Sequence, residues 1–100
     1  MSLKAYWIAH VTVDDDDAYQ AYRAANAAAF DKYRARFLVR GGPQQVVEGS
    51  ARPRTVVIEF DDLQTAQACY NSPEYGAARA LREPVSAADI IIVEGWAGAG

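Results

Sequence analysis

Cysteine, histidine and methionine each occur only once in the 100 residues of this chain. The single cysteine, Cys69, excludes an internal disulfide and agrees with a reducing, cytoplasmic compartment. No zinc-ligand spacing, phosphate-cradling glycine loop or serine nucleophile elbow occurs in the sequence. If the protein is an enzyme, we therefore expect it to use no metal and no organic cofactor.

The chain also lacks an excess of basic residues and any long apolar run. Ten basic residues against 13 acidic ones give a net charge of −3, so we expect neither nucleic acid nor a membrane surface as a partner. No run is long enough to span a bilayer, and the first residues contain no signal-peptide core. With 51% hydrophobic residues, residues 1–100 are predicted to form one soluble domain.

The first half of the chain reads as a strand followed by a helix. Ala5 to Val13 alternates an apolar set, with Trp7 at its centre, with an amphipathic set that includes His10. The acidic run at 14–17 offers N-cap residues. Residues 18–34 then form an alanine-rich helix with an aromatic stripe, while its charged residues, including Arg23, are expected to face water. The stripe consists of Tyr19, Tyr22, Asn26, Phe30 and Tyr33.

The second half contains two further strands, a pair of helices and a last strand. Residues 36–48 are predicted to form one long strand kinked at the glycines 41 and 42, followed by a turn at 49–53 and a strand at 54–60. Asp61 or Asp62 caps a helix that runs to Tyr70. Ser72 and Pro73 start another helix, which runs to about Arg82. The apolar run inside residues 88–96 is typical of a buried strand.

The element order β-α-β-β-α-β predicts a ferredoxin-like α+β fold with an antiparallel sheet in the strand order 4-1-3-2. We expect the first and third strands to be parallel neighbours. Two helical segments cover only one face of such a sheet, yet the other face would carry Ile8, Leu38, Val57 and alternate members of 90–93. A bare apolar face of that size predicts a homodimer that packs face to face.

Several short motifs, in their order and spacing, resemble the family known as domain of unknown function 1330. They are Tyr6-Trp7-Ile8-Ala9, Asn26 in the aromatic-striped helix, Phe37 to Gly42, Glu48-Gly49, Arg52 to Phe60 and Tyr70 to Tyr75. The resemblance covers nearly the whole chain. It implies membership of the dimeric α/β-barrel superfamily, whose members include cofactor-independent monooxygenases and isomerases. The family itself has no settled activity.

His10 and Glu59 are the candidate acid/base pair. Both fall on the same predicted face of neighbouring strands, so a carboxylate could orient the imidazole and raise its pKa. The alternative is a structural polar pair at a dimer seam.

Arg40 and Arg54 are candidate anion-binding residues at strand ends. Arginine holds a carboxylate or enolate through bidentate hydrogen bonds. The alternative is a salt bridge to Glu48, Glu59 or Glu94. Asn26 could contact a ligand or bond a loop backbone, and Tyr6 and Tyr70 could present hydroxyls to a cavity.

Taken together, the sequence predicts binding of a small apolar or aromatic carboxylate-type metabolite between the sheet and the helices. Cofactor-independent acid/base, isomerase-like or monooxygenase-like chemistry could accompany it. The alternative is a dimeric interaction module without catalysis. A cavity below about 300 Å3 would favour the module.

Overall fold

The computed structural model describes residues 3–98. Its strands are β1 (Ala5–Val13), β2 (Arg36–Arg40), β3 (Arg54–Phe60) and β4 (Ser86–Glu94). Its α-helices are α1 (Asp16–Lys32), α2 (Leu63–Tyr70) and α3 (Pro73–Arg82), and a 3-10 turn at Glu83–Val85 leads into β4. Three side-chain caps start these helices: Asp15 bonds the Ala18 N–H, Asp62 the Thr65 N–H and Ser72 the Tyr75 N–H.

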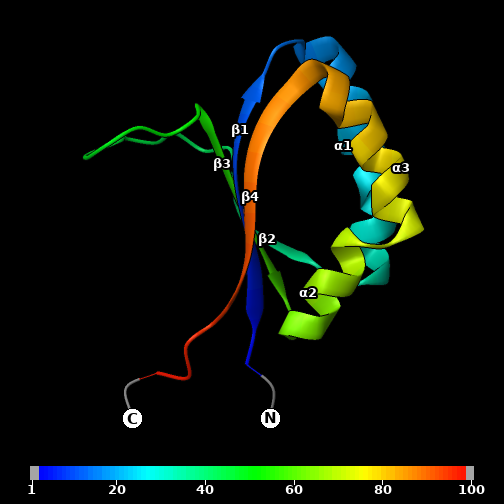
Figure 1. The fold of residues 1–100 in the computed structure, drawn as a ribbon, viewed down its shortest axis with the longest axis vertical. Coiled ribbons are helices and arrows are strands. Elements are labelled where there is room, and N and C mark those ends of the chain that lie inside the picture. Colours follow the sequence, from blue (N-terminus) through cyan, green and yellow to red (C-terminus); the bar gives the residue numbers. More distant parts are fainter. Residues whose placement is uncertain (1–2, 99–100) are drawn as a thin grey trace.

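The four strands form one sheet in the order β2-β3-β1-β4, with all the helices on one face (Figure 1). This is the ferredoxin-like arrangement predicted from the element order. Every neighbouring pair of strands is antiparallel. No helix among residues 3–98 is long and apolar enough to cross a membrane.

The prediction that β1 and β3 are parallel was wrong. The helix α1 returns the chain so that β2 runs in the same direction as β1, and the following connection reverses it, so β3 opposes both. The register therefore places His10 against Thr55 and Tyr6 against Glu59. His10 and Glu59 lie four residues apart along the strand direction, about 13 Å at the usual rise per residue.

The core lies between the sheet and the helices and is centred on Trp7, which is 2% exposed. The rings of Phe60 and Tyr75 pack against it with centroids at 5.2 and 4.9 Å. Its Nε1–H donates to the Ala66 carbonyl oxygen at 2.9 Å. The predicted aromatic stripe of α1 faces this core, where Tyr19, Tyr22 and Phe30 are buried.

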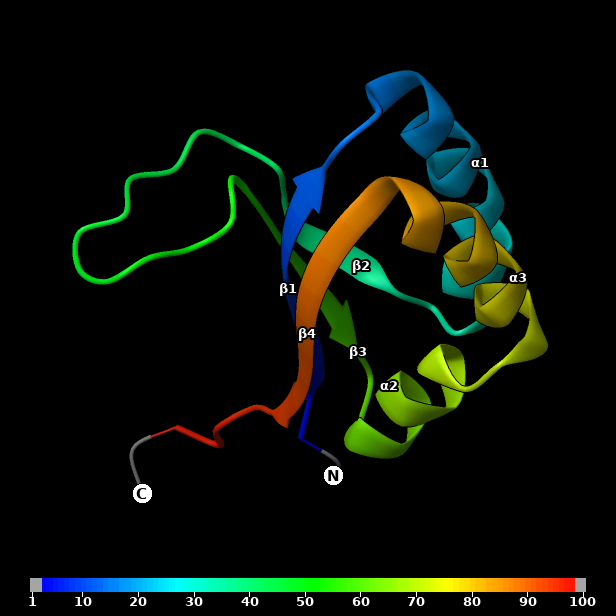
Figure 2. The same ribbon diagram turned by 45° about the horizontal axis from the view of Figure 1, so that its top comes forward.

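The predicted strand over 44–48 is absent. Residues 41–53, which we call the arm, lie on the helix-free side of the sheet as an irregular loop (Figures 1 and 2). Gly41 has φ +73°, a left-handed conformation that turns the chain away from the path of β2. Side-chain contacts replace strand pairing: Gln44 donates to the Arg52 carbonyl, and Arg52 bonds Thr12 and Asp89.

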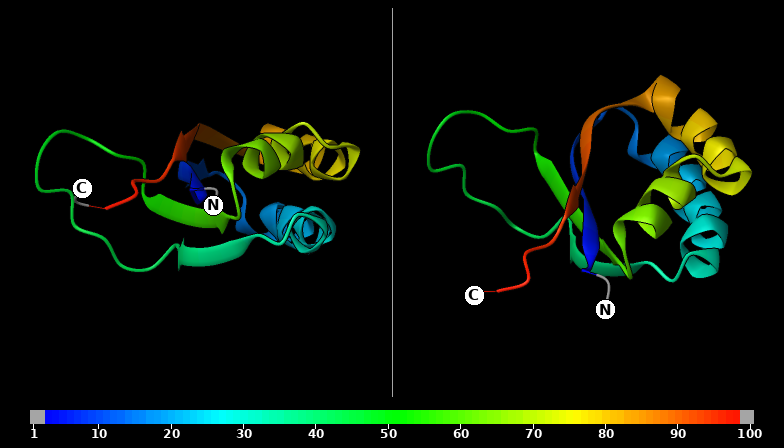
Figure 3. Two further views of the ribbon diagram at one scale, coloured as in Figure 1. Left: turned by 90° about the horizontal axis from the view of Figure 1, so that it is seen from below. Right: turned by 60° about the horizontal axis from the view of Figure 1, so that its bottom comes forward.

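A row of apolar residues crosses the helix-free face of the sheet. The pairing register aligns Val39, Val57, Ile8 and Ile91 from β2 to β4. Ile91 is 58% exposed, and Leu38, at the edge strand, is 56% exposed. The two views of Figure 3 show that no helix lies over this face. The uncovered apolar face predicted from the sequence is therefore present.

Candidate functional site

A small cavity lies between the sheet and the helices. The volume open to the centres of water molecules is about 40 Å3, and its wall is mostly apolar. The polar and charged side chains in the wall are Tyr19, Tyr22, Arg23, Asn26, Arg40, Arg54, Tyr75 and Arg82. No aspartate or glutamate among the described residues belongs to the wall, so its only charged side chains there are arginines.

Two of these arginines come from the sheet. Arg54 is the first residue of β3 and shares the helix-facing side with Val56, Ile58 and Phe60, because side chains alternate along a strand. Arg40 reaches the same side through a register shift between Phe37 and Val39. Without that bulge, Arg40 would share the helix-free face with Arg36.

The guanidinium of Arg54 lies directly against the backbone of Gly41. A Cβ at this position would lie 2.1 Å from Arg54 Nη1 and 2.7 Å from its Cζ, so the side chain passes directly over the glycine. The Gly41 N–H also donates to the Thr55 carbonyl oxygen at 2.9 Å, which ties the end of β2 to β3. Gly41, the first of the two glycines predicted to kink the strand, therefore gives the Arg54 side chain room to lie over the end of β2.

The other two arginines come from the helices. Arg23 lies on the cavity-facing side of α1, one turn after Tyr19, and its guanidinium stacks over that ring at 5.8 Å. Arg82 ends α3, is only 6% exposed and stacks over Tyr22 at 5.6 Å. The expectation that Arg23 faces water was wrong, because its spacing from Tyr19 and Asn26 places it within the aromatic stripe.

These four arginines make no ion pair within the described part of the chain, where Arg34, Arg36 and Arg52 do. The buried Nε atoms of Arg23, Arg54 and Arg82 also lack hydrogen-bond partners. Burial raises the pKa of Tyr19, and the positive charges of Arg54, Arg82 and Arg23 oppose that rise. The predicted alternative, a salt bridge from Arg40 or Arg54 to a glutamate, is therefore not what the structure contains.

Neutral hydrogen-bonding groups complete the wall. Asn26 is 5% exposed, and its amide makes no hydrogen bond to another of the described residues. The hydroxyls of Tyr22 and Tyr75 lie 2.9 Å apart. Burial, together with the neighbouring Tyr75 hydroxyl, raises the pKa of Tyr22, so Tyr22 stays protonated and can only act as a neutral hydrogen-bonding group.

An open hollow of about 300 Å3 adjoins the cavity on the α1 side. The two share Val11, Tyr19, Arg23 and Arg54, so these residues form the neck between them. Asp16 and Gln20 stand on the outer wall of the hollow. A ligand entering here would meet Arg23 and Arg54 before reaching the aromatic residues.

The structure brings together three of the predicted site residues, Arg40, Arg54 and Asn26. It places His10 on the other face of the sheet, where Nδ1 lies 3.1 Å from the Thr55 hydroxyl. Tyr70 packs against Trp7 at 5.6 Å and accepts a hydrogen bond from Arg79 Nη1, outside the cavity wall. Its functional role, like those of His10, Glu59 and Tyr6, stays a prediction.

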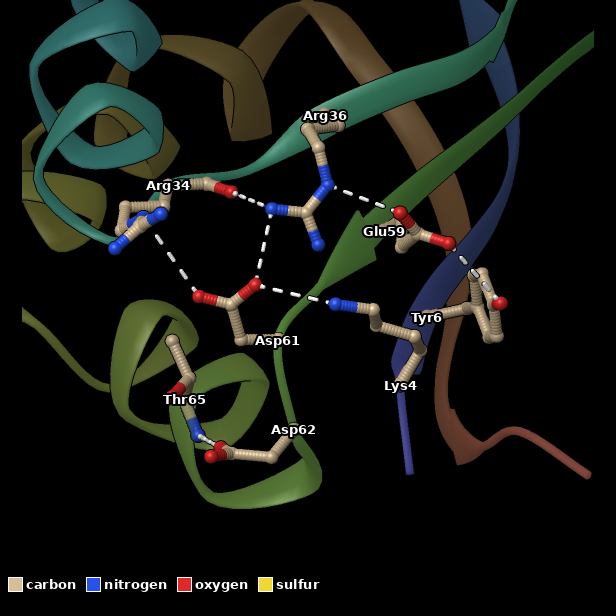
Figure 4. A network of polar contacts seen from close by, with 8 residues as sticks. All are labelled: Lys4, Tyr6, Arg34, Arg36, Glu59, Asp61, Asp62 and Thr65. Carbon is tan, nitrogen blue, oxygen red and sulfur yellow. Dashed lines mark hydrogen bonds and ion pairs between the residues drawn. The ribbon is translucent and has the colours of Figure 1, made fainter. Parts of the chain in front are cut away.

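Glu59 and Tyr6 belong to a polar network at the end of the sheet nearest the N-terminus (Figure 4). Arg36 Nε donates to Glu59 at 2.9 Å, and the Tyr6 hydroxyl donates to its other oxygen at 3.2 Å. The hydrogen bond from Arg36 lowers the pKa of Glu59. Glu59 is bonded to Arg36 and Tyr6 and lies four residues from His10 along the strand direction, so the predicted contact between His10 and Glu59 was wrong.

Cys69 is fully buried, and burial raises the pKa of its thiol to about 12, so the thiol stays protonated. Arg82 is the site residue that sequence reasoning missed altogether. Its only sequence signal is its place at a helix end, two residues before Pro84. Among residues 3–98, no group of three or more His, Cys, Asp or Glu side chains could hold a metal ion.

Solved structures share this fold at low sequence identity. A protein of unknown function from Rhodopseudomonas palustris is 13% identical, with a TM-score of 0.74, over 98% of this chain and 86% of that one. A dimeric protein of unknown function with a ferredoxin-like fold from Bacteroides fragilis is 15% identical, with a TM-score of 0.61, over 92% and 96%. A cofactor-independent oxygenase from Streptomyces nogalater is 10% identical, with a TM-score of 0.62, over 97% of each chain.

At these identities the solved structures establish the fold alone. No curated protein matches the chain. The family model described as domain of unknown function (DUF1330) matches residues 4–96, nearly the full length of the sequence. The resemblance seen in the sequence motifs is thereby confirmed, and the chain belongs to the DUF1330 family.

Proposed function

We propose that the protein binds a small carboxylate in the cavity between the sheet and the helices. The observation that carries this proposal is the set of four arginines, Arg23, Arg40, Arg54 and Arg82, around an apolar cavity without a carboxylate in its wall. Buried charges in proteins are normally paired. A bound anion would supply the missing partner and offset the mutual repulsion of the guanidinium groups.

The neck between cavity and hollow is the best place for the anionic group. Arg23 and Arg54 both line it, and Arg40 lies beside Arg54 across the β2–β3 pair. A planar guanidinium binds a carboxylate through two parallel hydrogen bonds, so two of these arginines suffice to hold it. Asn26 is then free to bond a polar atom deeper in the ligand.

The small volume restricts the ligand. About 40 Å3 of space for water centres holds a few water molecules, far below the 300 Å3 of a typical site for a drug-sized molecule. By the criterion stated for the sequence, this size taken alone favours an interaction module. The arginines outweigh it. Arg82 is 6% exposed, Arg23 and Arg54 are half-buried, and none of the cavity arginines makes an ion pair with a described residue, which a module without a ligand does not require. A short apolar carboxylate satisfies both observations.

Binding rather than acid/base chemistry is what the cavity supports. Its wall offers no imidazole or carboxylate among the described residues. The buried Tyr22 hydroxyl stays protonated, so it cannot act as a general base. Isomerase-like or monooxygenase-like turnover, as suggested by the superfamily, would therefore rely on the reactivity of the bound molecule. Incubating the protein with a bound carboxylate in an oxygen electrode would reveal such oxidation.

The test of the binding proposal is calorimetric titration of wild-type protein with short carboxylates such as butyrate, hexanoate and benzoate. Arg54→Gln and Arg40→Gln are expected to weaken binding by about tenfold or more, because each removes one charged partner. Arg34→Gln is the matched control, since the Arg34 side chain is 78% exposed and lies outside the cavity. Equal affinities in all four proteins would overturn the proposal.

We also propose that two copies pair through their helix-free sheet faces. No helix of the described residues covers the apolar row Val39, Val57, Ile8 and Ile91, and Ile91 at its end is 58% exposed. Ile91→Glu is expected to give monomers in sedimentation experiments at micromolar concentration, whereas Leu81→Glu, on helix α3, leaves the dimer intact. A wild-type protein that sediments as a monomer would contradict this pairing.

A further inference from the structure

The cavity arginines stand at two opposite ends rather than in one group. Arg40 and Arg54 rise from β2 and β3, and Arg23 faces them from α1. Arg82 lies at the other end, beside Ile90 of β4. Strands β3 and β4 are separated by β1, so the strand that carries Arg54 and the strand beside which Arg82 lines the wall are about 10 Å apart at the usual strand spacing.

Each end of the cavity opens to its own hollow. Arg23 and Arg54 are shared with the hollow on the α1 side. Arg82 and Ile90 are shared with a second hollow, of about 390 Å3, at the β4 edge. Between the two necks run the aromatic residues Trp7 and Tyr22. The space between sheet and helices is thus a narrow apolar passage with unpaired cations at both necks.

We propose that this passage selects a slender dianion, a linear dicarboxylate, whose two carboxylates meet Arg82 at one end and Arg23 with Arg54 at the other. This inference rests on the proposed carboxylate-binding function and names its ligand class. A monocarboxylate leaves one end unpaired. Among the cavity arginines, buried Nε atoms that lack partners occur on Arg23 and Arg54 at one neck and on Arg82 at the other, as expected for a ligand charged at both ends.

The width of the passage decides between a chain and a ring. The cavity has about 40 Å3 of room for water centres. So small a space admits a methylene chain more readily than a benzene ring carrying two substituents. The acids near the necks, Asp16 in one hollow and Glu83 in the other, make no ion pair with Arg23, Arg54 or Arg82. They therefore leave both ends available to the ligand.

Calorimetric titration of the whole protein with pairs of acids of equal chain length tests the inference. Succinate is compared with butyrate and adipate with hexanoate, and the monomethyl ester of adipate keeps the length while removing one charge. We expect at least one dicarboxylate to bind about tenfold more tightly than both its monocarboxylate partner and its monoester. Terephthalate, which is charged at both ends but wide, is expected to bind more weakly than adipate.

The variant Arg82→Gln is expected to lower the ratio of dicarboxylate to monocarboxylate affinity about tenfold, to near one. Arg54→Gln is expected to weaken both. If Arg82→Gln does not fold, as judged by circular dichroism, the comparison of acids on wild-type protein still tests the inference. Equal binding of each dicarboxylate and its monocarboxylate partner, for both chain lengths, would overturn this inference while leaving the proposed function intact. Absence of binding by every carboxylate would overturn the proposed function itself.

Discussion

At the scale of single residues, Gly41 controls where the Arg54 guanidinium lies. Replacing it with alanine introduces a Cβ 2.1 Å from Arg54 Nη1 and forces a side chain into a left-handed backbone conformation at φ +73°. We expect Gly41→Ala to displace Arg54 from the neck and to weaken carboxylate binding by about tenfold, with a loss of about 1 kcal/mol in the free energy of unfolding. Calorimetry and urea denaturation measure the two effects.

Gly49→Ala is the matched control for this substitution. Gly49 has the same φ of +73°, but a Cβ there would meet no atom within 4 Å. The backbone cost should therefore be similar, while carboxylate binding should stay at the wild-type level. A loss of binding of the same size in both variants would show that strain in the arm, rather than the position of Arg54, governs the site.

The sequence predicted half of the cavity's arginines. Arg54 was identifiable because it opens a strand with regular alternation, and Arg40 because it precedes a glycine pair. Arg23 could have been found from its spacing to Tyr19 on the helix, but arginine in an alanine-rich helix is usually solvated. Arg82 could not be found, because its burial depends on how α3 packs against β4, which no local pattern specifies.

At the scale of elements, the start of α3 is stabilised by Ser72. Its hydroxyl accepts a hydrogen bond from the Tyr75 N–H at 3.1 Å and donates one to the Cys69 carbonyl oxygen at 2.7 Å, and the residue is 6% exposed. Ser72→Ala should lower the free energy of unfolding by about 2 kcal/mol, at the upper end for an N-cap, since it leaves the buried Tyr75 N–H unpaired and removes one of the hydrogen bonds to the Cys69 carbonyl oxygen. Urea denaturation monitored by circular dichroism measures the loss.

Asp15→Ala is the matched control for that cap. Asp15 bonds the Ala18 N–H at 3.1 Å in an exposed position, where water can replace it, so a loss of about 1 kcal/mol or less is expected. A Ser72→Ala variant no less stable than Asp15→Ala would contradict the assigned role of burial at this junction.

Element boundaries were predicted well where local chemistry sets them and poorly where pairing does. Asp62, Ser72 and Pro73 mark helix starts by their own capping chemistry. The direction of β3 relative to β1 depends on the path through α1 and β2, and the bulge in β2 depends on its partner. For the same reason, the arm could not be recognised as a loop: its residues 44–48 have strand-like composition but no neighbouring strand to pair with.

At the scale of the whole molecule, the ion network of Figure 4 connects the first residues of β1 to β2 and to the start of α2. Asp61 lies within 3.1 Å of Arg36 Nη1, 3.5 Å of Lys4 Nζ and 3.7 Å of Arg34 Nε. Partial desolvation acts to raise the pKa of Asp61, but these cations, Arg36 above all, outweigh it and lower the pKa. The pKa of Glu59 is lowered mainly by the hydrogen bond that Arg36 donates to it.

Stability should therefore fall when the protein is acidified. Carboxyl groups whose pKa is lower in the folded state stabilise it fully above their unfolded pKa values, about 4, and lose that contribution as the pH falls through the folded values. We expect the free energy of unfolding to be nearly constant from pH 7 to 5 and to decrease below about pH 4.5.

Arg36→Met should flatten this decrease, because it removes the partner shared by both acids, whereas Arg52→Met should not. Urea denaturation across this range measures the slope of the free energy of unfolding against pH. Identical slopes in wild type and Arg36→Met would show that other carboxylates, such as Glu74 beside Lys32, govern the acid response.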